Sequence, residues 1–430
     1  MFSSLRHPVL VVSRINTLTG QTRRRAAAFS LALVFGLALA VSPLAQAQAF
    51  TVLYSFAGYP TDGAGPGAGL LMDAAGTLYG TTAFGGNVNG AHCASSGYLG
   101  CGTVFKLDTN GVETVLHNFT GRDGADSSAT LIRDAKGVLY GTTTYGGNLQ
   151  DCGGTGAAGC GVVFELSGDK ETVLHRFTGG DGAFPQAGLV MDGHGNLYGT
   201  AVYGGKFNDG VVFKLAGKKE TVLHSFTGGK DGAEPASGLL LDATGNLYGT
   251  DAYGGDIDCD YPSGCGVVFK LAGKHLRVLY SFKGPPNGEE PIAAVIMDAE
   301  GNLYGTTDRG GPYNAGTVFE LSPSGRERVL HRFRVNYKVQ HDGEVPDTAV
   351  VRDAQGNLYG TTEDGGPSGY GVVYEITADG KEKILHSFCS GDCLDGAYPN
   401  GLIMDAKGNL YGTAFGGGVN KHGTIFMITP

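Results

Sequence analysis

Short apolar runs recur along this chain in a constant order. In one period they are AGLVMD (187–192), NLYGTA (196–201), GVVFKL (210–215) and ETVLHSF (220–226). Each run is rich in Val, Leu and aromatic residues and is bounded by Gly, Asp or Asn, which is typical of β-strands and their turns. We call the four predicted strands A, B, C and D.

The second run recurs as a Leu-Tyr-Gly motif with a period of 50 to 61 residues. Its tyrosines are Tyr79, Tyr140, Tyr198, Tyr248, Tyr304, Tyr359 and Tyr411. A period of this size indicates a repeat architecture.

The predicted strands A and B are joined by the motif Asp-x-x-Gly, as in Asp298-Ala299-Glu300-Gly301. Asp can bond its own backbone there and Gly accepts the left-handed conformation, so A and B are predicted to form an antiparallel hairpin. Gly305 inside strand B predicts the close approach of a neighbouring sheet.

Four antiparallel strands repeated seven times predict an all-β, seven-bladed β-propeller with one four-stranded blade per repeat. The mature chain begins with TVLYSF (51–56), a D strand, and ends with GTIFMI (423–428), a C strand. The last repeat therefore lacks its D strand. We predict that 51–56 pairs with the blade of residues 400–428 and closes the ring, and that 50–430 is a single domain.

The first 49 residues have a different composition. The stretch QTRRRAAAFSLALVFGLALAVSPLAQAQAF (21–50) holds three arginines, an apolar run and small-x-small sites. This layout predicts a secretory signal peptide over 1–49, cleaved after Ala47 or Ala49. An uncleaved anchor is disfavoured because the apolar run is shorter than the roughly 20 residues that span a bilayer. We expect an exported protein, periplasmic or extracellular, with no membrane insertion after cleavage.

The mature chain is acidic. Residues 1–49 hold five arginines and no acid, which leaves 26 basic against 41 acidic residues and a net charge of −15. Such a surface repels phosphate backbones, so nucleic acid is excluded as a partner, whereas cations, neutral sugars and basic partners are compatible. We expect a monomer.

All cysteines of the mature chain fall into close pairs. They are Cys93 and Cys101, Cys152 and Cys160, Cys259 and Cys265, and Cys389 and Cys393. An even number behind a signal peptide predicts local disulfides, and none of the pairs has the C-x2-C spacing of a zinc site. Three pairs lie in predicted B–C loops and the fourth in a D–A loop. They either preserve the shape of a binding face or compensate for Gly-rich loops with little core.

The repeat resembles a known family. The core GNLYGTT-x-x-GG, the following G-x-VF-x-L and TVLHSF with GGDGA-x-P behind it are similar to the tandem repeats of GloVer-containing proteins, which are exported bacterial proteins. The resemblance covers essentially all of residues 50–430. It implies export and β-propeller-like repeats rather than a particular reaction. Many members carry a C-terminal sorting or anchoring segment, and this sequence stops two residues after its last predicted strand, so we expect a soluble product.

Departures from the repeat gather in the B–C and D–A connections, which surround the channel on one face of a propeller. Asp308-Arg309 and Glu363-Asp364 replace the small residue and aromatic of most blades, and the D–A loops add acids and aromatics. The candidate ligand-binding residues are Asp126, Phe184, Glu234, Glu289, Glu290, Asp308, Arg309, Glu344, Glu363, Asp364 and Tyr398. If they converge, they form an acidic rim that suits a cation, a sugar or a basic peptide. The alternative is a solvated polar face.

Two repeated features are given structural interpretations. The Asp-Gly pairs of the D–A loops lack the spacing of a calcium loop and are interpreted as turns. One position of strand D is histidine in five blades: His117, His175, His224, His331 and His386. A ring of five identical positions predicts packing or inter-blade hydrogen bonds rather than catalysis. No catalytic residue and no metal ligand is assigned.

These observations favour an exported binding or interaction scaffold that presents its loop-bearing channel face to a protein or glycan. The alternative is a lyase or hydrolase that acts on a glycan or lactone with channel-mouth carboxylates. No cofactor is predicted for the scaffold, and a divalent cation such as calcium is the candidate for the enzyme. A third alternative is a structural envelope component with no pocket. Close clustering of carboxylates would favour the enzyme, and an even spread around the rim would favour binding.

Overall fold

The computed structural model describes most of the chain beyond the predicted signal peptide. The chain divides into a unit Met1–Ala45 and a unit Gln46–Pro430. The predicted signal peptide, apart from Ala49, lies outside the described residues. Among the residues described, no helix is long and apolar enough to cross a membrane. The described residues are 49–86, 93, 99–148, 152, 159–256, 258–259, 263–334 and 342–429.

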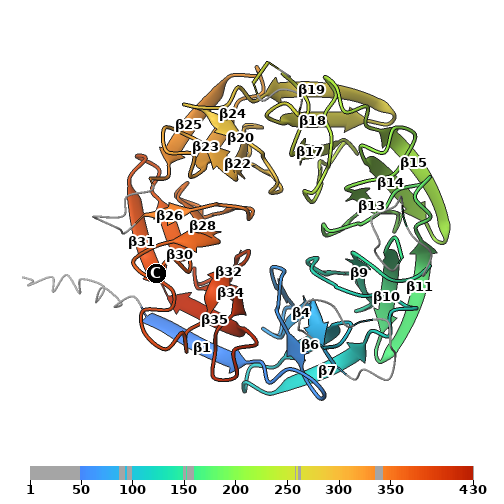
Figure 1. Cartoon of the computed structure of the whole chain (residues 1–430), viewed down its shortest axis with the longest axis vertical. Helices are drawn as coiled ribbons and strands as arrows, with labels where there is room; N and C mark the ends of the chain where they lie inside the picture. The colour runs from blue at the N-terminus through green and yellow to red at the C-terminus, as the bar shows by residue number, and fades with distance from the viewer. Residues whose placement is uncertain are drawn as a thin grey trace, which may run out of the picture. The chain divides into compact units, whose positions relative to one another are not determined.

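The second unit is a ring of seven antiparallel sheets, so the predicted all-β, seven-bladed propeller is confirmed (Figure 1). Six blades have four strands in the order A-B-C-D, and the seventh has five because β32 (Ala397–Pro399) joins it. The D strands lie on the outside of the ring and the B strands lie toward its centre (Figure 1). We number the blades 1 to 7 by their A strands.

The four strand types have the following bounds. The A strands are β3 (Leu71–Met72), β8 (Ile132–Arg133), β12 (Val190–Met191), β16 (Leu240–Leu241), β21 (Ile296–Met297), β27 (Val351–Arg352) and β33 (Ile403–Met404). The B strands are β4 (Leu78–Thr82), β9 (Leu139–Thr143), β13 (Leu197–Ala201), β17 (Leu247–Asp251), β22 (Leu303–Thr307), β28 (Leu358–Thr362) and β34 (Leu410–Gly416). The C strands are β6 (Thr103–Leu107), β10 (Val162–Ser167), β14 (Val211–Ala216), β18 (Val267–Ala272), β24 (Thr317–Leu321), β30 (Val372–Ile376) and β35 (Thr424–Thr429). The D strands are β7 (Glu113–Asn118), β11 (Lys170–Arg176), β15 (Lys219–Ser225), β19 (His275–Ser281), β25 (Glu327–Arg332), β31 (Glu382–Ser387) and, for blade 7, β1 (Ala49–Ser55).

Three short ladders join the D–A loops to the ends of strand B. They are β2 (Gly63–Ala64) with β5 (Phe84–Gly85), β20 (Gly288–Glu289) with β23 (Arg309–Gly310), and β26 (Gly343–Glu344) with β29 (Asp364–Gly365). These ladders tie each D–A loop to the strand that follows it along the chain, so residues of the two segments share one edge of the blade.

The first strand of the unit belongs to the last blade. β1 pairs antiparallel with β35, with Ala49 opposite Thr429 and Ser55 opposite Thr424. On the channel side, Thr413 Oγ1 of blade 7 donates to the backbone oxygen of Ala68 before blade 1, at 2.8 Å. The two ends of the repeat array are therefore joined both in a sheet and through a side chain.

The threonine of the Leu-Tyr-Gly-Thr motif links each blade to the next. Thr142 Oγ1 donates to the backbone oxygen of Ala187, before strand A of the following blade, at 3.0 Å. Equivalent bonds start from Thr81, Thr200, Thr250, Thr306, Thr361 and Thr413. This explains why the strand predicted over 187–192 is only Val190–Met191: the Ala187 carbonyl bonds a side chain of the preceding blade instead of its own sheet.

The glycine of the motif serves a different contact from the one expected. A Cβ on Gly305 would lie 2.8 Å from the ring of Phe319. Phe319 is the cross-strand partner of Gly305 within the same blade, so the close approach comes from strand C and not from a neighbouring sheet. The Phe319 ring is fully buried and meets Phe282 of the preceding blade edge-to-face, with centroids 5.2 Å apart. The glycine thus makes room for an aromatic ring that joins two blades.

The tyrosine and aspartate of the motif close the A–B turn as predicted. Asp298 Oδ1 accepts from the backbone N–H groups of Glu300 and Asn302, and Oδ2 accepts from Tyr304 Oη at 2.9 Å. One carboxylate therefore satisfies the turn and the tyrosine of the next strand. These hydrogen bonds hold the pKa of Asp298 below its usual value, although burial acts in the opposite direction.

Candidate functional site

Each blade places one residue with a left-handed backbone at the mouth of the channel, just before strand A. These residues have φ angles of 54–63° and are Gly65, Asp126, Phe184, Glu234, Glu290, Val345 and Tyr398. Two backbone hydrogen bonds hold Glu290 there: its N–H donates to the Cys265 oxygen at 3.1 Å and its oxygen accepts from Asp308 N–H at 2.9 Å. A left-handed conformation at a residue other than Gly costs on the order of 1–3 kcal/mol and persists where the surroundings enforce it. The mouth positions are therefore rigid.

The channel below the mouth is lined mostly by uncharged residues. A cavity of about 370 Å³ is lined by residues from all seven blades, chiefly Gly, Ala, Ser, Thr and Leu, and Asp347 is the only charged residue of this lining. Its Oδ1 is buried and has no hydrogen-bond partner. Burial raises the pKa of Asp347 to about 7, and the charges of Glu363 and Asp308 add to the effect.

Sequence reasoning missed Asp347, although the repeat carries a signal for it. Other blades have a neutral residue at this position: Gly67, Ser128, Gln186, Ala236 and Ile292. A single acid among small or neutral equivalents is the kind of departure that marked Asp308 and Glu363. It lies one residue before the predicted strand A, at the end of the D–A connection.

Blades 5 and 6 form the acidic sector of the mouth, which we define as Glu290, Asp308, Asp347, Glu363 and Asp364 around Arg309. Arg309 Nε lies 3.4 Å from Glu290 Oε2 and 3.6 Å from Asp308 Oδ2. Burial raises the pKa of Asp308 to about 6; Glu290, Glu363 and Asp364 add to the rise and Arg309 opposes it. Burial and Asp364 likewise raise the pKa of Glu363. Arg309 thus contacts two of the five carboxyl groups, and the charges of Glu290, Glu363 and Asp364 act on Asp308.

The other side of the mouth forms the aromatic sector, which we define as Phe84, Tyr145, Phe184, Tyr203 and Phe415. The buried Phe184 ring meets Tyr145 at a centroid distance of 5.4 Å and Tyr203 at 6.0 Å. Phe84 and Phe415 meet edge-to-face at 6.3 Å. Aromatic rings in such arrangements present flat apolar faces beside polar edges. At the left-handed position, blade 3 of the aromatic sector thus carries Phe184, whereas blade 5 of the acidic sector carries Glu290.

The remaining predicted residues lie at the borders or away from the mouth cluster. Tyr398 packs on Tyr370 at 5.4 Å, and burial, Tyr370 and the sector carboxylates Asp364 and Glu363 raise its pKa. Asp126 Oδ1 accepts from Ser128 Oγ at 2.6 Å. Glu234 hydrogen-bonds Tyr203, which lowers the Glu234 pKa against a larger rise from burial.

Two further predicted acids, Glu289 and Glu344, lie beside members of the acidic sector in different surroundings. Glu289 Oε2 lies 3.6 Å from Cys265 Sγ, beside a disulfide, whereas the next residue, Glu290, faces Arg309. Glu344 is the ladder partner of Asp364 and is affected by Asp364 and Asp342, which together with burial raise its pKa. The two adjacent glutamates that looked equivalent in the sequence therefore have different surroundings.

All four predicted disulfides form, and three of them brace the mouth. The pairs are Cys93–Cys101, Cys152–Cys160, Cys259–Cys265 and Cys389–Cys393. The backbone oxygens of Cys101, Cys160 and Cys265 accept the N–H groups of Asp126, Phe184 and Glu290. This arrangement favours the interpretation that the disulfides preserve the shape of a face. Cys259, Cys265 and Glu289 lie close enough to hold a metal, but the two sulfurs are bonded to each other and offer no thiolate.

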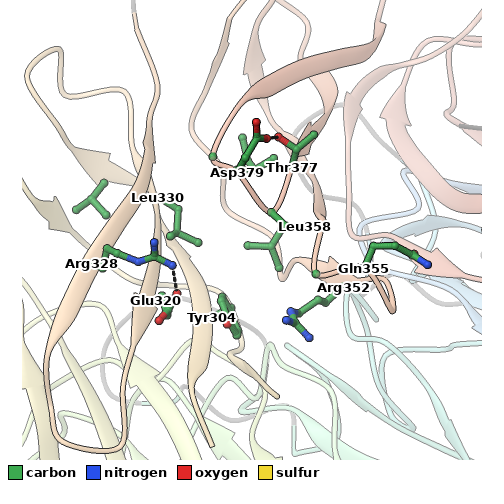
Figure 2. Close-up of a pocket in the computed structure, with 14 residues that line it drawn as sticks. Tyr304, Glu320, Arg328, Leu330, Arg352, Gln355, Leu358, Thr377 and Asp379 are labelled. Atoms are coloured by element: carbon green, nitrogen blue, oxygen red, sulfur yellow. Dashed lines mark hydrogen bonds and ion pairs between the residues drawn. The ribbon is translucent and has the colours of Figure 1, made fainter. Parts of the chain in front are cut away.

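A second cavity, of about 320 Å³, lies between blades 5 and 6 at the turns A–B and C–D, the opposite ends of the strands from the mouth. Figure 2 shows Arg328 paired with Glu320 on one side and Arg352 on the other. The Arg352 guanidinium lies over the Tyr304 ring, 5.3 Å from its centroid. Tyr304 also bonds Asp298, so this cavity is built from the same turn that every blade repeats.

The comparisons identify a repeat family. Residues 151–351 and 335–430 match the profile described as the Gloeobacter/Verrucomicrobia repeat, which is more than half of the 430 residues. No curated protein matches the chain.

Several solved structures match the chain at low identity. The extracellular domain of the one-component system BT4673 from B. thetaiotaomicron is 10% identical with a TM-score of 0.48; the match covers 83% of this chain, which spans only 37% of that protein. XC5397 from Xanthomonas campestris, a gluconolactonase, is 14% identical with a TM-score of 0.41 over 89% of each chain. PorZ from Porphyromonas gingivalis, a surface component of the type-IX secretion system, is 14% identical with a TM-score of 0.48 over 83% of this chain and 46% of its own. TM-scores below 0.5 at these identities carry over no function.

Proposed function

The chain belongs to the Gloeobacter/Verrucomicrobia repeat family, and we propose that this member is an exported interaction scaffold whose channel mouth binds a basic segment of a partner protein. The observation that carries the proposal is a set of five carboxyl groups that raise one another's pKa values, together with one guanidinium, that of Arg309, whose only ion pairs among the described residues are with Glu290 and Asp308. The proposed location is the periplasm or the cell exterior, with which four disulfides agree.

The electrostatics of the acidic sector support a cationic ligand. The raised pKa values of Asp308 and Asp347 reflect buried carboxyl groups that also repel one another. A lysine or arginine side chain placed among them relieves this repulsion and restores the charged forms. Charge complementarity of this kind also steers association and rejects acidic partners.

The shape of the mouth supports a peptide rather than a free ion. The aromatic sector adjoins the acidic one, and rings such as Tyr145, with 36% of its surface exposed, offer a face for the apolar stem of a lysine or arginine. The channel volume of about 370 Å³ suits a group of side-chain size. The disulfide-braced backbone keeps the two sectors in place before the ligand arrives, which lowers the entropic cost of binding.

The test is calorimetric titration of the mature chain, disulfides intact, with tetralysine. We expect binding that weakens at least tenfold, about 1.4 kcal/mol, when Asp308→Asn is combined with Glu363→Gln. The matched control combines Glu300→Gln with Asp379→Asn, two exposed acids in turns at the opposite ends of the strands. This control changes the net charge equally and should leave binding unchanged.

Two results would overturn the proposal. Equal weakening by both double variants would mean that tetralysine responds to net charge alone. Binding of the neutral sugar chitotriose in place of tetralysine would make the mouth a glycan site.

A further inference from the structure

The outer edge of the propeller holds clusters that the mouth does not explain. At three of the seven blade junctions a histidine of strand D, an aspartate of the D–A loop and a glutamate of the next strand D converge. Their ligand atoms lie within 4.8 Å of one another in each of His117/Asp123/Glu171, His175/Asp181/Glu220 and His331/Asp342/Glu382. We call these the edge triads. They join blades 1 and 2, 2 and 3, and 5 and 6.

In each edge triad one carboxylate oxygen has no donor. Oε1 of Glu171, Glu220 and Glu382 is buried and has no hydrogen-bond partner. The histidine proton serves the aspartate instead, with His117 Nε2 at 3.2 Å from Asp123 Oδ2 and His175 Nε2 at 3.0 Å from Asp181 Oδ2. An unpartnered buried acceptor costs on the order of 1–3 kcal/mol. A proton joins only two of the three groups, whereas a metal ion binds all three.

The triad between blades 5 and 6 is the most open of the three. His331 Nε2 lies 3.5 Å from Asp342 Oδ1 and 3.6 Å from Glu382 Oε1, and neither His331 Nε2 nor Glu382 Oε1 makes a hydrogen bond. Two ligands bound at about 2.0–2.1 Å around a tetrahedral zinc ion lie roughly 3.4 Å apart. The observed separations of 3.5 and 3.6 Å are closer to this ligand-to-ligand distance than to the length of a normal hydrogen bond.

The aspartates are already oriented by a second set of bonds. Asp123 Oδ1 accepts from the backbone N–H and the hydroxyl of Thr120, which leaves Oδ2 toward the histidine. Thr178 holds Asp181 in the same way. Metal-ligating carboxylates are commonly fixed by such outer hydrogen bonds. The triad side chains are 15–22% exposed where measured, which leaves a path for an ion.

Each of the other four junctions lacks at least one member, and the junction of blades 4 and 5 lacks two because Asn287 also replaces the aspartate. Oε1 of Glu113 and of Glu327, at two of these junctions, is likewise buried without a hydrogen-bond partner. Tyr54 and Tyr280 replace the histidine, and their hydroxyls donate to Asp62 and Glu327. Leu276 and Phe50 replace the glutamate, and the pairs His224–Asp231 and His386–Asp395 remain hydrogen-bonded. The imidazole, the aspartate and the glutamate occur together only at the three edge triads, so these junctions alone offer a full set of nitrogen and oxygen ligands.

We propose that the three edge triads are binding sites for a divalent transition-metal ion of the Zn²⁺ type, held by one imidazole and two carboxylates across the blade junction. Imidazole and carboxylate ligands suit Zn²⁺, and water completes the coordination of a three-ligand protein site. Because the ligands come from two blades, the ion stabilises the closed ring.

The test is metal counting on the mature chain with its disulfides intact. The protein is treated with EDTA, dialysed, titrated with Zn²⁺ alone and analysed by elemental mass spectrometry. We expect up to three zinc ions per chain and a rise in Tm on loading. Glu171→Gln, Glu220→Gln and Glu382→Gln should each remove one ion, and the triple variant should remove all three.

Glu113→Gln is the matched control, because Glu113 occupies the same strand-D position beside Tyr54 and Asp62 and should leave the count unchanged. Zinc that persists in a folded triple variant would lie on exposed histidines such as His194, with 88% of its side chain accessible, and would overturn the proposal. If the triple variant does not fold, the test is the coordination shell of zinc in the wild-type chain, measured by X-ray absorption spectroscopy. A shell of nitrogen and oxygen at about 2.0–2.1 Å supports the sites, and a shell containing sulfur, or no retained zinc, overturns them.

Discussion

The two sides of the channel mouth share a backbone and differ in chemistry. Phe184 and Glu290 occupy equivalent left-handed positions, and each donates its N–H to the oxygen of a disulfide-bonded cysteine. Around Phe184 lie tyrosine rings; around Glu290 lie Arg309 and further acids. The repeat therefore builds a neutral frame, and a few substitutions per blade give each sector its charge. The chemistry of each sector therefore depends on which blades depart from the repeat.

The frame under both sectors should be equally sensitive to core mutation. Phe213 in blade 3 and Phe319 in blade 5 are both fully buried and both lie over the glycine of strand B. Phe213→Ala and Phe319→Ala should each lower the free energy of unfolding by about 3–5 kcal/mol, measured by urea denaturation. Losses that differ by several kcal/mol between the two blades would show that the sectors do not rest on equivalent cores.

Asp347 should make the acidic sector sensitive to pH. Burial is the chief reason that its pKa is raised to about 7 in the folded protein, from an ordinary value of 3.8 that stands for the unfolded chain. The folded state therefore binds the proton more tightly, and stability falls as the pH rises from about 4 to 7. Asp347→Asn should remove this slope and stabilise the protein at pH 8 by roughly 2–4 kcal/mol. The difference between wild type and variant across pH 4–8, measured by urea denaturation, is the readout.

The matched variant on the aromatic side is Gln186→Asp, which places an acid at the equivalent position of blade 3. It should introduce a smaller slope of the same sign, because no acidic sector surrounds it. A stability difference between wild type and Asp347→Asn that does not change with pH would contradict the burial of the Asp347 carboxyl group.

Blade 4, between the two sectors, carries a buried acid where four other blades have threonine and two have alanine. Thr143 and Thr307 donate to the backbone oxygens of Tyr145 and Arg309. Asp251 occupies the same position, is fully buried and has no hydrogen bond to either carboxyl oxygen, and its pKa is raised well above the usual value by burial and by Asp231.

Asp251→Thr should therefore stabilise the protein by about 1–3 kcal/mol at pH 7, seen as a higher Tm. The converse change, Thr307→Asp, should destabilise by a similar amount. A lower Tm for Asp251→Thr would mean that the aspartate has a partner the hydroxyl cannot replace.

The smallest effect is expected from Arg309 itself. Its side chain is 54% exposed, and its contacts to Glu290 and Asp308 are 3.4 and 3.6 Å. Exposed ion pairs contribute about 0.2–1 kcal/mol, so Arg309→Gln should lower stability by no more than that, and less at high salt. The same variant should strengthen tetralysine binding, because the competing cation is gone. Weaker binding would assign Arg309 to the ligand.

The repeated parts of this structure were readable in the sequence. Asp298 and Tyr304 predicted a turn, and one carboxylate closes it. Gly305 predicted a close approach, although the approaching group is the Phe319 ring of the same blade, because a sequence pattern does not show which strand pairs across a glycine. The disulfides were also predictable, since paired cysteines four to eight residues apart need no long-range information.

The acidic sector was only partly predictable. Glu290, Asp308 and Glu363 stood out as departures, but their grouping on one side depends on blades 5 and 6 being neighbours in the ring. Glu289 is predicted with them but lies beside Cys265, because it ends β20 whereas Glu290, the next residue, has a left-handed backbone.

Contacts between residues within one repeat are enough to specify a blade. The aspartate turn, the glycine and the alternation of the strands all act between residues that are near one another along the chain. The ring, the mouth and the buried position of Asp347 depend on contacts between blades, such as the Thr142 hydroxyl on the Ala187 carbonyl. Those contacts bring together side chains that are remote in sequence, and burial among them sets the pKa values and charges that a single repeat cannot show.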